Sequence, residues 1–287
     1  MIFNRLLALL IPLAISPLVP AEDQPEAAED DKPKAGHSHQ GEAFNQGPRH
    51  SALPIDGTGN ISFPIRCSWE EGQQFFNQGI GQLHGFWYYE AERTFRQIAS
   101  KDPDCAMAYW GMAMANWENE KRAKAFIKRA SELQEKATEQ NQRYIQAQAN
   151  YLDGEPKDAK KRKQELIDDL EGIIQDYPAD IEARAILCVR LWQFGRSGLP
   201  IHSHQAVDAI LQQIFAVNPM HPAHHYRIHL WDGKKAKVAL DSAAKLGHTA
   251  PGIAHMWHMP GHIYSKLKRW DDSAFAQEAS ARTDHNY

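Results

Sequence analysis

From about residue 69 onward, apolar residues recur every three or four positions, as they do on the buried face of an amphipathic helix. Three successive runs show this spacing, and their apolar positions are Phe75, Phe76, Ile80 and Leu83, then Ala91, Phe95 and Ile98, then Tyr109, Trp110, Ala113 and Trp117. Alternation with a period of two, which would indicate strands, is nearly absent. The pattern predicts an all-α fold.

Proline marks the boundaries between the predicted helices. Asp102-Pro103, Tyr177-Pro178 and Asn218-Pro219 each close one helical run and precede the next. Proline stops a helix because it has no amide donor and its ring clashes with the preceding turn. The unequal intervals between these prolines indicate degenerate repeats with insertions, and we expect helices in antiparallel pairs.

Two segments resemble the tetratricopeptide repeat (TPR), a helix-turn-helix unit. The first combines Phe75-x-x-Gln78-Gly79 with Ala91, Phe95 and Pro103, and the second is Trp257-x-x-Pro260-Gly261-x-x-Tyr264. Residues 102–111 and 258–264 are also similar to motifs in a group of exported bacterial TPR proteins without an established activity. The resemblance implies a TPR-like α-solenoid over residues 61–287 and a binding role, and it supplies no reaction.

The first 60 residues differ from the rest in composition. Residues 1–21 contain a short basic start, an apolar run and small residues before an acidic turn, which predicts a cleaved signal peptide and an exported chain, periplasmic or extracellular. Residues 22–60 are acidic and poor in large apolar side chains. We expect them to form a disordered linker, and we expect no membrane span to remain after cleavage.

Charge and cysteine content narrow the function classes further. The formal net charge is −4 and the pI about 6.4, so no basic field would attract nucleic acid. Only Cys67, Cys105 and Cys188 are present, without a Cys-x-x-Cys motif. Either one disulfide forms and one thiol is left over, or all three are buried, inert thiols.

Histidine is the most informative residue type in the second half of the chain. In TPR proteins the groove-facing residues lie two before, one after and five after the signature aromatic, and the resemblance carries these positions onto His255, His258 and His262 around Trp257. The spacing i, i+3 and i+7 places them on one side of a helix. The resemblance therefore implies that all three point into a concave groove.

The preceding predicted helix has a second histidine row. His221, His225 and His229 are four residues apart, although Pro222 starts that helix and leaves the position of His221 open. We expect the two rows to face one another, because adjacent helices lie about 10 Å apart. The same groove is expected to include His84, Trp110 and Trp117.

Three interpretations of these histidines remain: polar lining, a groove for a peptide or protein partner, and a metal site. Imidazole suits zinc and copper, and the metal interpretation uses His225, His229, His255, His258 and His262 as ligands, with Met256 and Met259 adding soft ligands for Cu(I). No carboxylate is spaced like the base of His-Glu-x-x-His, and no catalytic serine or phosphate-loop motif occurs.

The sequence thus predicts a non-catalytic exported TPR scaffold that binds a protein or peptide partner, with a histidine-based metal protein or metalloenzyme as the alternative. Solenoids usually end in a polar capping helix. Because none is evident here, we expect either that the natural chain continues past Tyr287 or that this end packs on a partner.

Overall fold

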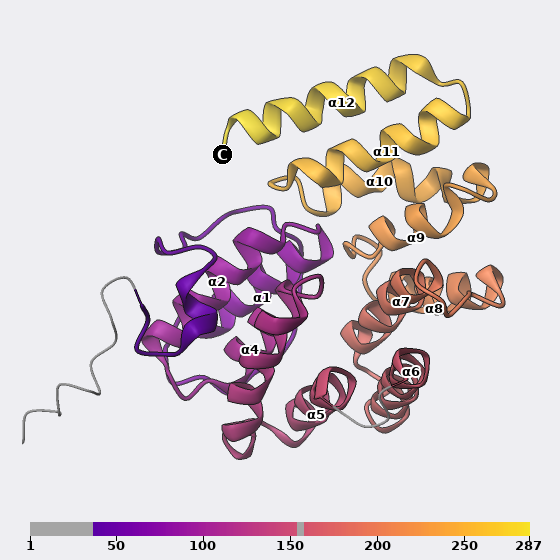
Figure 1. Ribbon diagram of the computed structural model, residues 1–287. Helices are drawn as coiled ribbons and strands as arrows, with labels where there is room; N and C mark the ends of the chain where they lie inside the picture. Colours follow the sequence, from indigo (N-terminus) through magenta and orange to yellow (C-terminus); the bar gives the residue numbers. More distant parts are fainter. Residues whose placement is uncertain (1–36, 154–157) are drawn as a thin grey trace, which may run out of the picture.

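The computed structural model describes residues 37–153 and 158–287. The predicted signal peptide, residues 1–21, and the first part of the predicted linker, residues 22–36, lie outside the described ranges. Within those ranges all regular structure is helical, which confirms the predicted all-α class (Figure 1). None of the described helices is both long and apolar enough to cross a membrane.

The helices follow one another along the chain, and each packs against the next. Their bounds are α1 (Gly72–His84), α2 (Tyr88–Lys101), α3 (Ala106–Ala115), α4 (Glu120–Glu132), α5 (Glu139–Asp153), α6 (Ala159–Asp176), α7 (Ile181–Gly195), α8 (His204–Val217), α9 (His224–Trp231), α10 (Leu240–Thr249), α11 (Ala254–Lys266) and α12 (Trp270–His285). Short 3-10 helices are η2 (Glu42–Asn45), η3 (Gln134–Lys136) and η4 (Ala236–Ala239).

The proline boundaries lie where the sequence predicts them. Pro103 separates α2 from α3, Pro178 separates α6 from α7, and Pro219 separates α8 from α9. Odd-numbered helices also touch their odd-numbered neighbours: α1 contacts α3, α3 contacts α5, α7 contacts α9, and α9 contacts α11. The chain curves as it proceeds (Figure 1), so that the end of α1 approaches α7 and α9.

Two glycines allow α1, α2 and α3 to pack closely around Phe95. A Cβ added to Gly79 would lie 2.6 Å from the Phe95 ring, and one added to Gly111 would lie 2.5 Å from it. Phe95 is fully buried, so its ring cannot move aside without disturbing the core. The close contact explains why glycine stands at position 79 of the first TPR-like segment.

We therefore expect Gly79→Ala to lower the free energy of unfolding by about 1–3 kcal/mol, since the steric cost of overpacking exceeds the gain in helix propensity. Urea unfolding of the purified variant measures the change. Gly233→Ala is the matched control, because a Cβ at Gly233 would meet no atom within 4 Å. Equal stability of the two variants would contradict the proposed packing role.

The N-terminal segment 37–60 departs from the predicted disordered linker, because polar side chains of the helices satisfy its backbone. Gln78 of α1 accepts a hydrogen bond from the Ile55 amide at 2.8 Å and donates to the Leu53 carbonyl at 3.0 Å. Composition alone misses this ordering, since the partners are long amide side chains elsewhere in the chain and not apolar residues of the segment itself.

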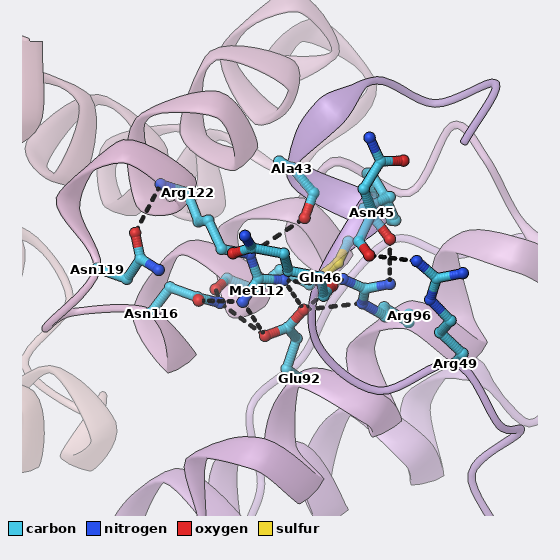
Figure 2. A network of polar contacts seen from close by, with 11 residues as sticks. Ala43, Asn45, Gln46, Arg49, Glu92, Arg96, Met112, Asn116, Asn119 and Arg122 are labelled. Carbon is cyan, nitrogen blue, oxygen red and sulfur yellow. Dashed lines mark hydrogen bonds and ion pairs between the residues drawn. The ribbon is translucent and has the colours of Figure 1, made fainter. Parts of the chain in front are cut away.

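A buried ion-pair network fixes the beginning of the same segment (Figure 2). Glu92 of α2 is 3% exposed and accepts hydrogen bonds from Arg96 at 2.8 Å and from Arg122 of α4 at 2.9 Å. The two guanidinium groups also donate to backbone carbonyls of η2, Arg96 to Phe44 at 3.2 Å and Arg122 to Ala43 at 3.1 Å. The arginines therefore join the segment to α2 and α4.

Further along, the segment reaches the helices of the second half. The Gly57 carbonyl accepts a hydrogen bond from the Gly252 amide at 2.8 Å, and the Asn60 carbonyl accepts one from the Asn218 side chain at 3.0 Å. Gly57 has a φ of 74°, a conformation that favours glycine. The Thr58 carbonyl lies directly against Gly81 of α1, so residues 57–60 connect α1 with the residues that follow α8 and precede α11.

All three cysteines are free thiols. Cys67 is partly exposed and Cys105 is buried, and their sulfur atoms lie within 4.8 Å of each other and of an Asp102 carboxylate oxygen. Cys188 is buried in the separate hydrophobic core formed by the second half of the chain. If one disulfide forms, the geometry therefore favours Cys67 with Cys105.

Candidate metal centre

Three of the predicted histidines converge between α9 and α11. His225 and His229 are one turn apart in α9, and His255 lies in the first turn of α11. One ring nitrogen from each lies within 4.8 Å of the others. We call His225, His229 and His255 the histidine cluster. Of the five predicted ligands, these are the three that the structure brings together around one point.

The hydrogen bonds of His225 fix its tautomer. Its Nδ1 lies 2.6 Å from the backbone carbonyl of His84, and a carbonyl oxygen only accepts, so Nδ1 carries the proton and donates. The Nε2 atom of the neutral ring then has a free lone pair, and it faces Nε2 of His229 at 3.0 Å. A metal-binding imidazole usually has this arrangement, with its outer nitrogen donating to a carbonyl.

His255 contributes an unpaired atom to the cluster. Its Nε2 is buried and has no hydrogen-bond partner among the described residues. A buried polar group without a partner costs about 1–3 kcal/mol, so such atoms need an explanation, for which an unseen ion or water is the usual one. The same residue supplies one of the three ring nitrogens that lie within 4.8 Å of one another.

Aromatic rings lie against the cluster. The Phe86 ring lies 4.3 Å from that of His225, centroid to centroid, and Trp192 stacks on His229 at 4.2 Å. Burial lowers the pKa of His229 to about 3 and that of His255 to about 4, with further lowering from neighbouring histidines. Burial also lowers the pKa of His225. All three rings are therefore neutral at pH 7, the form that binds metals.

Two surface pockets give access to the cluster. His255 lines a pocket with an empty volume of about 560 Å³ between α11 and the C-terminal residues, together with Phe86 and Tyr287. His229 lines another of about 670 Å³, together with Trp192 and His204. Both histidines are partly exposed. An ion could therefore reach the cluster from solvent without unfolding of the surrounding helices.

His258 and His262 form a separate pair, one turn further along α11, with their Nε2 atoms 3.0 Å apart. Gln277 of α12 donates to the His258 carbonyl at 3.2 Å, which orients its amide, and its Oε1 accepts from His258 Nδ1 at 2.6 Å. The His258 Nε2 lone pair thus faces His262. α11 continues through Pro260, and His262 remains beside His258.

The predicted soft ligands are not part of the cluster. Met256 and Met259 are 0% and 2% exposed and belong to the hydrophobic core of the second half. Neither methionine lines the pockets beside His229 and His255. The Cu(I) variant of the metal hypothesis therefore loses its thioether donors.

His84 and His221 belong to a different, fully buried network centred on Glu182 of α7. Glu182 accepts from His84 Nε2 at 2.8 Å and from His221 Nε2 at 3.0 Å. The remaining nitrogens also have partners, since His221 Nδ1 accepts from the Ala223 amide and His84 Nδ1 contacts the Tyr226 hydroxyl at 2.6 Å. Every ring nitrogen is satisfied within the protein, so this network needs no metal.

The two tryptophans expected in an open groove lie inside the protein. Trp110 is 1% exposed, and its indole donates to the Tyr144 carbonyl at 3.2 Å. Trp117 is partly buried and, with Trp110 and His84, lines a small cavity. The expected groove is filled at this point because the turn after α1, at Phe86, inserts between α7, α9 and α11.

Sequence reasoning missed Glu182, Tyr226, Phe86 and Trp192, which surround or orient the histidines. Phe86 has a φ of 55°, rare for a bulky residue and found where the surrounding structure imposes it. Gly85-Phe86-Trp87, which ends the first predicted helix, was the available signal for an unusual turn. Nothing local in the sequence indicates that this turn contacts α9.

Comparison with known proteins leaves the structure as the main guide to function. No family model matches the chain. No curated protein is significantly similar to it.

Proposed function

We propose that the protein binds a divalent transition-metal ion, zinc in the first instance, through His225, His229 and His255. The observation that supports this most directly is that one ring nitrogen from each of these three histidines lies within 4.8 Å of the others. His255 also has a buried Nε2 atom without a hydrogen-bond partner in the described residues. In the network around Glu182, by contrast, both ring nitrogens of His84 and of His221 have hydrogen-bond partners within the protein.

The geometry is close to what ligation requires. Zinc–nitrogen bonds of about 2.0–2.1 Å in a tetrahedral site place two ligand nitrogens about 3.3 Å apart. The His225 and His229 Nε2 atoms are 3.0 Å apart, and one ring nitrogen of His255 lies within 4.8 Å of the nitrogens of the other two histidines. A small movement of the His255 ring toward them would complete the site. Three imidazoles leave one position for water, whose pKa zinc lowers to about 7.

The ligand set selects among metals. Three neutral imidazoles without a thiolate or thioether suit zinc, Cu(II) and Ni(II). Calcium and magnesium prefer oxygen ligands, and no carboxylate is part of the cluster in the described residues. We therefore expect zinc, Cu(II) and Ni(II) to bind at the cluster, and we expect calcium and magnesium not to bind there.

Zinc titration of protein made without an affinity tag and stripped with EDTA tests the proposal. We expect about one equivalent to bind and the midpoint of thermal unfolding to rise, because zinc binds only the folded arrangement. His229→Gln and His255→Gln should each weaken binding by roughly a hundredfold or more, since one of three protein–metal bonds is lost. Isothermal titration calorimetry and elemental analysis measure both effects.

Two further variants make the result specific. His202→Gln changes an exposed histidine outside the cluster and should leave zinc affinity unchanged. His258→Gln tests the separate pair, and loss of the single zinc in this variant would move the site to His258 and His262. Less than a tenth of an equivalent of zinc, copper or nickel, with no thermal shift, would remove the proposal.

A partner-binding scaffold is the second candidate, and the exposed aromatic residues of α12 support it. Trp270 is 63% exposed and Phe275 is 64% exposed, and such side chains are enriched where proteins recognise each other. Under this proposal the chain is an exported TPR-like repeat. Its recognition surface would be α12, since Trp110 and His225 of the expected groove are buried.

A further inference from the structure

Two thiols and a carboxylate meet where the chain enters α1 and α3. Cys67 shortly precedes Gly72, the first residue of α1, and Cys105 immediately precedes α3. Their sulfur atoms lie within 4.8 Å of each other and of an Asp102 carboxylate oxygen. The Cys105 sulfur also lies 3.7 Å from the carbonyl oxygen of Arg66, the residue before Cys67. The two thiols are therefore neighbours in space, although they are far apart in the chain.

The two thiols differ in access to solvent and in acidity. Cys67 is partly exposed, whereas Cys105 is 1% exposed. Hydrogen bonding from Cys105 lowers the pKa of the Cys67 thiol, and the Trp69 amide lowers it further. The interaction with Cys67 and burial both raise the pKa of the Cys105 thiol. Because the thiolate is the nucleophilic form, Cys67 is the thiol expected to react first.

The position of the Cys67 sulfur at the start of α1 supports the same order. A Cβ added to Gly72 would clash with this sulfur atom, so the sulfur lies directly against the first turn of the helix. The N-terminus of a helix carries a partial positive charge, which stabilises a thiolate nearby. Glycine at position 72 leaves the room that this contact requires.

Asp102 is a buried carboxylate beside both thiols. It is 7% exposed and accepts hydrogen bonds from the amides of Ser68 at 2.6 Å and of Asp104 at 3.2 Å. Burial would raise the pKa of Asp102, but hydrogen bonds from Ser68 and Cys67 outweigh burial and lower it. The carboxylate is therefore ionised at pH 7, and it lies within reach of a proton that leaves Cys105.

We propose that Cys67 is a site of thiol–disulfide exchange with small disulfides such as oxidised glutathione, and that Cys105 is its resolving thiol. First, the Cys67 thiolate attacks one sulfur of the disulfide, the S–S bond breaks, and one glutathione thiolate leaves and takes a proton from water. Next, Cys105 transfers its proton to Asp102 and attacks the Cys67 sulfur, which releases the second glutathione. Asp102 returns the proton to water. The two cysteines lose two electrons, and the glutathione disulfide is reduced to two thiols.

The new bond would connect the segment before α1 to the turn between α2 and α3. Residues 61–67 have no regular secondary structure, so the chain there can approach Cys105 until the sulfurs reach the bonded distance of about 2.05 Å. A cross-link between distant positions reduces the entropy of the unfolded chain. We therefore expect oxidation to raise the midpoint of thermal unfolding by about 5–10 °C.

The test uses the full chain, reduced with dithiothreitol, freed of the reductant and treated with oxidised glutathione near neutral pH in the presence of EDTA. We expect the intact mass to fall by two hydrogen atoms and one thiol to remain after denaturation. Peptide mapping of the wild-type product should join Cys67 to Cys105, which requires no variant to fold. Dithiothreitol should reverse both the mass change and the rise in the thermal midpoint.

Variants separate the two steps. Cys105→Ser keeps a donor beside Cys67 but cannot resolve the intermediate, so one glutathione should accumulate on Cys67. Cys67→Ser should form neither adduct nor disulfide. Cys188→Ala is the matched control, since Cys188 is buried in the other hydrophobic core, and it should behave as the wild type. Asp102→Asn should slow resolution relative to adduct formation, a ratio of rates that a merely structural role would not change.

Four results would overturn the proposal. They are no adduct in Cys105→Ser, an adduct on Cys188 in the folded wild type, two stable adducts without an internal bond, and thiols that react only when EDTA is present. The last result, measured against a parallel sample without EDTA, would assign Cys67, Asp102 and Cys105 to a metal ion. Zinc binding at the histidine cluster is measured separately in Cys67→Ser, so the two proposals fail independently.

Discussion

Replacement of Glu182 by alanine is expected to lower the free energy of unfolding by about 3–5 kcal/mol, the range measured when one partner of a buried ionic network is removed. Glu182 is 2% exposed and accepts from both His84 and His221. Its loss leaves two buried imidazole N–H groups without acceptors. Urea unfolding monitored by circular dichroism measures the change.

Two comparisons make the Glu182 result interpretable. Glu182→Gln keeps the shape and one acceptor, so it should cost less than alanine. Glu171→Ala removes an exposed glutamate of α6 and should change stability by less than about 0.5 kcal/mol. A Glu182→Ala protein as stable as the Glu171→Ala protein would show that the network contributes nothing, and the contact between α1 and α7 would need another explanation.

Acidification from pH 7.5 to pH 5 is expected to lower the free energy of unfolding by at least about 4 kcal/mol in metal-free protein. Burial lowers the pKa of His229 to about 3 and that of His255 to about 4, whereas the unfolded chain titrates near the ordinary value of about 6.5. Between these values the unfolded state binds more protons than the folded state, so stability falls as pH falls. Each ring contributes about 2 kcal/mol at pH 5, at 1.36 kcal/mol per pH unit below 6.5.

Denaturant unfolding at the two pH values, with EDTA present, measures this dependence. The double variant His229→Gln, His255→Gln should lose the part that these two rings contribute, about 4 kcal/mol, and exposed His202→Gln should retain the full dependence. Glu182 makes the free energy of unfolding depend on pH in a more acidic range than the histidines do. Burial would raise its pKa, but His221 and His84 outweigh burial and hold it at about 2. Its stabilising contribution is complete above about pH 4.5 and is lost as pH falls toward 2. Equal stability at pH 7.5 and pH 5 would contradict the burial of the cluster.

Local patterns in the sequence were sufficient for the helices. The three-to-four spacing around Phe75, Phe95 and Trp110, and the prolines at 103, 178 and 219, locate helices and boundaries that the structure confirms. These features depend on interactions within one or two turns, and such interactions can be inferred from neighbouring residues. Gly79 likewise marks a close approach that the structure explains through Phe95.

The candidate site was only partly predictable. The spacing of four residues predicts that His225 lies beside His229 and that His258 lies beside His262, because residues four apart share a helix face. The addition of His255 to the first pair, and the separation of the second, depend on how α9 and α11 pack. Segment 37–60 was misjudged for a related reason, since its partners, Gln78, Arg96 and Arg122, are distant in the chain.

By itself, then, the sequence determined the helical class, the helix boundaries and the presence of histidine pairs, all of which follow from short-range periodicity. The tertiary structure alone decided which imidazoles meet, that Phe86 fills the expected groove, and that Cys67 lies beside Cys105. The physical reason is that burial and partnering depend on contacts between residues such as His84 and His225, 141 positions apart, and no local pattern encodes the distance between such residues in space.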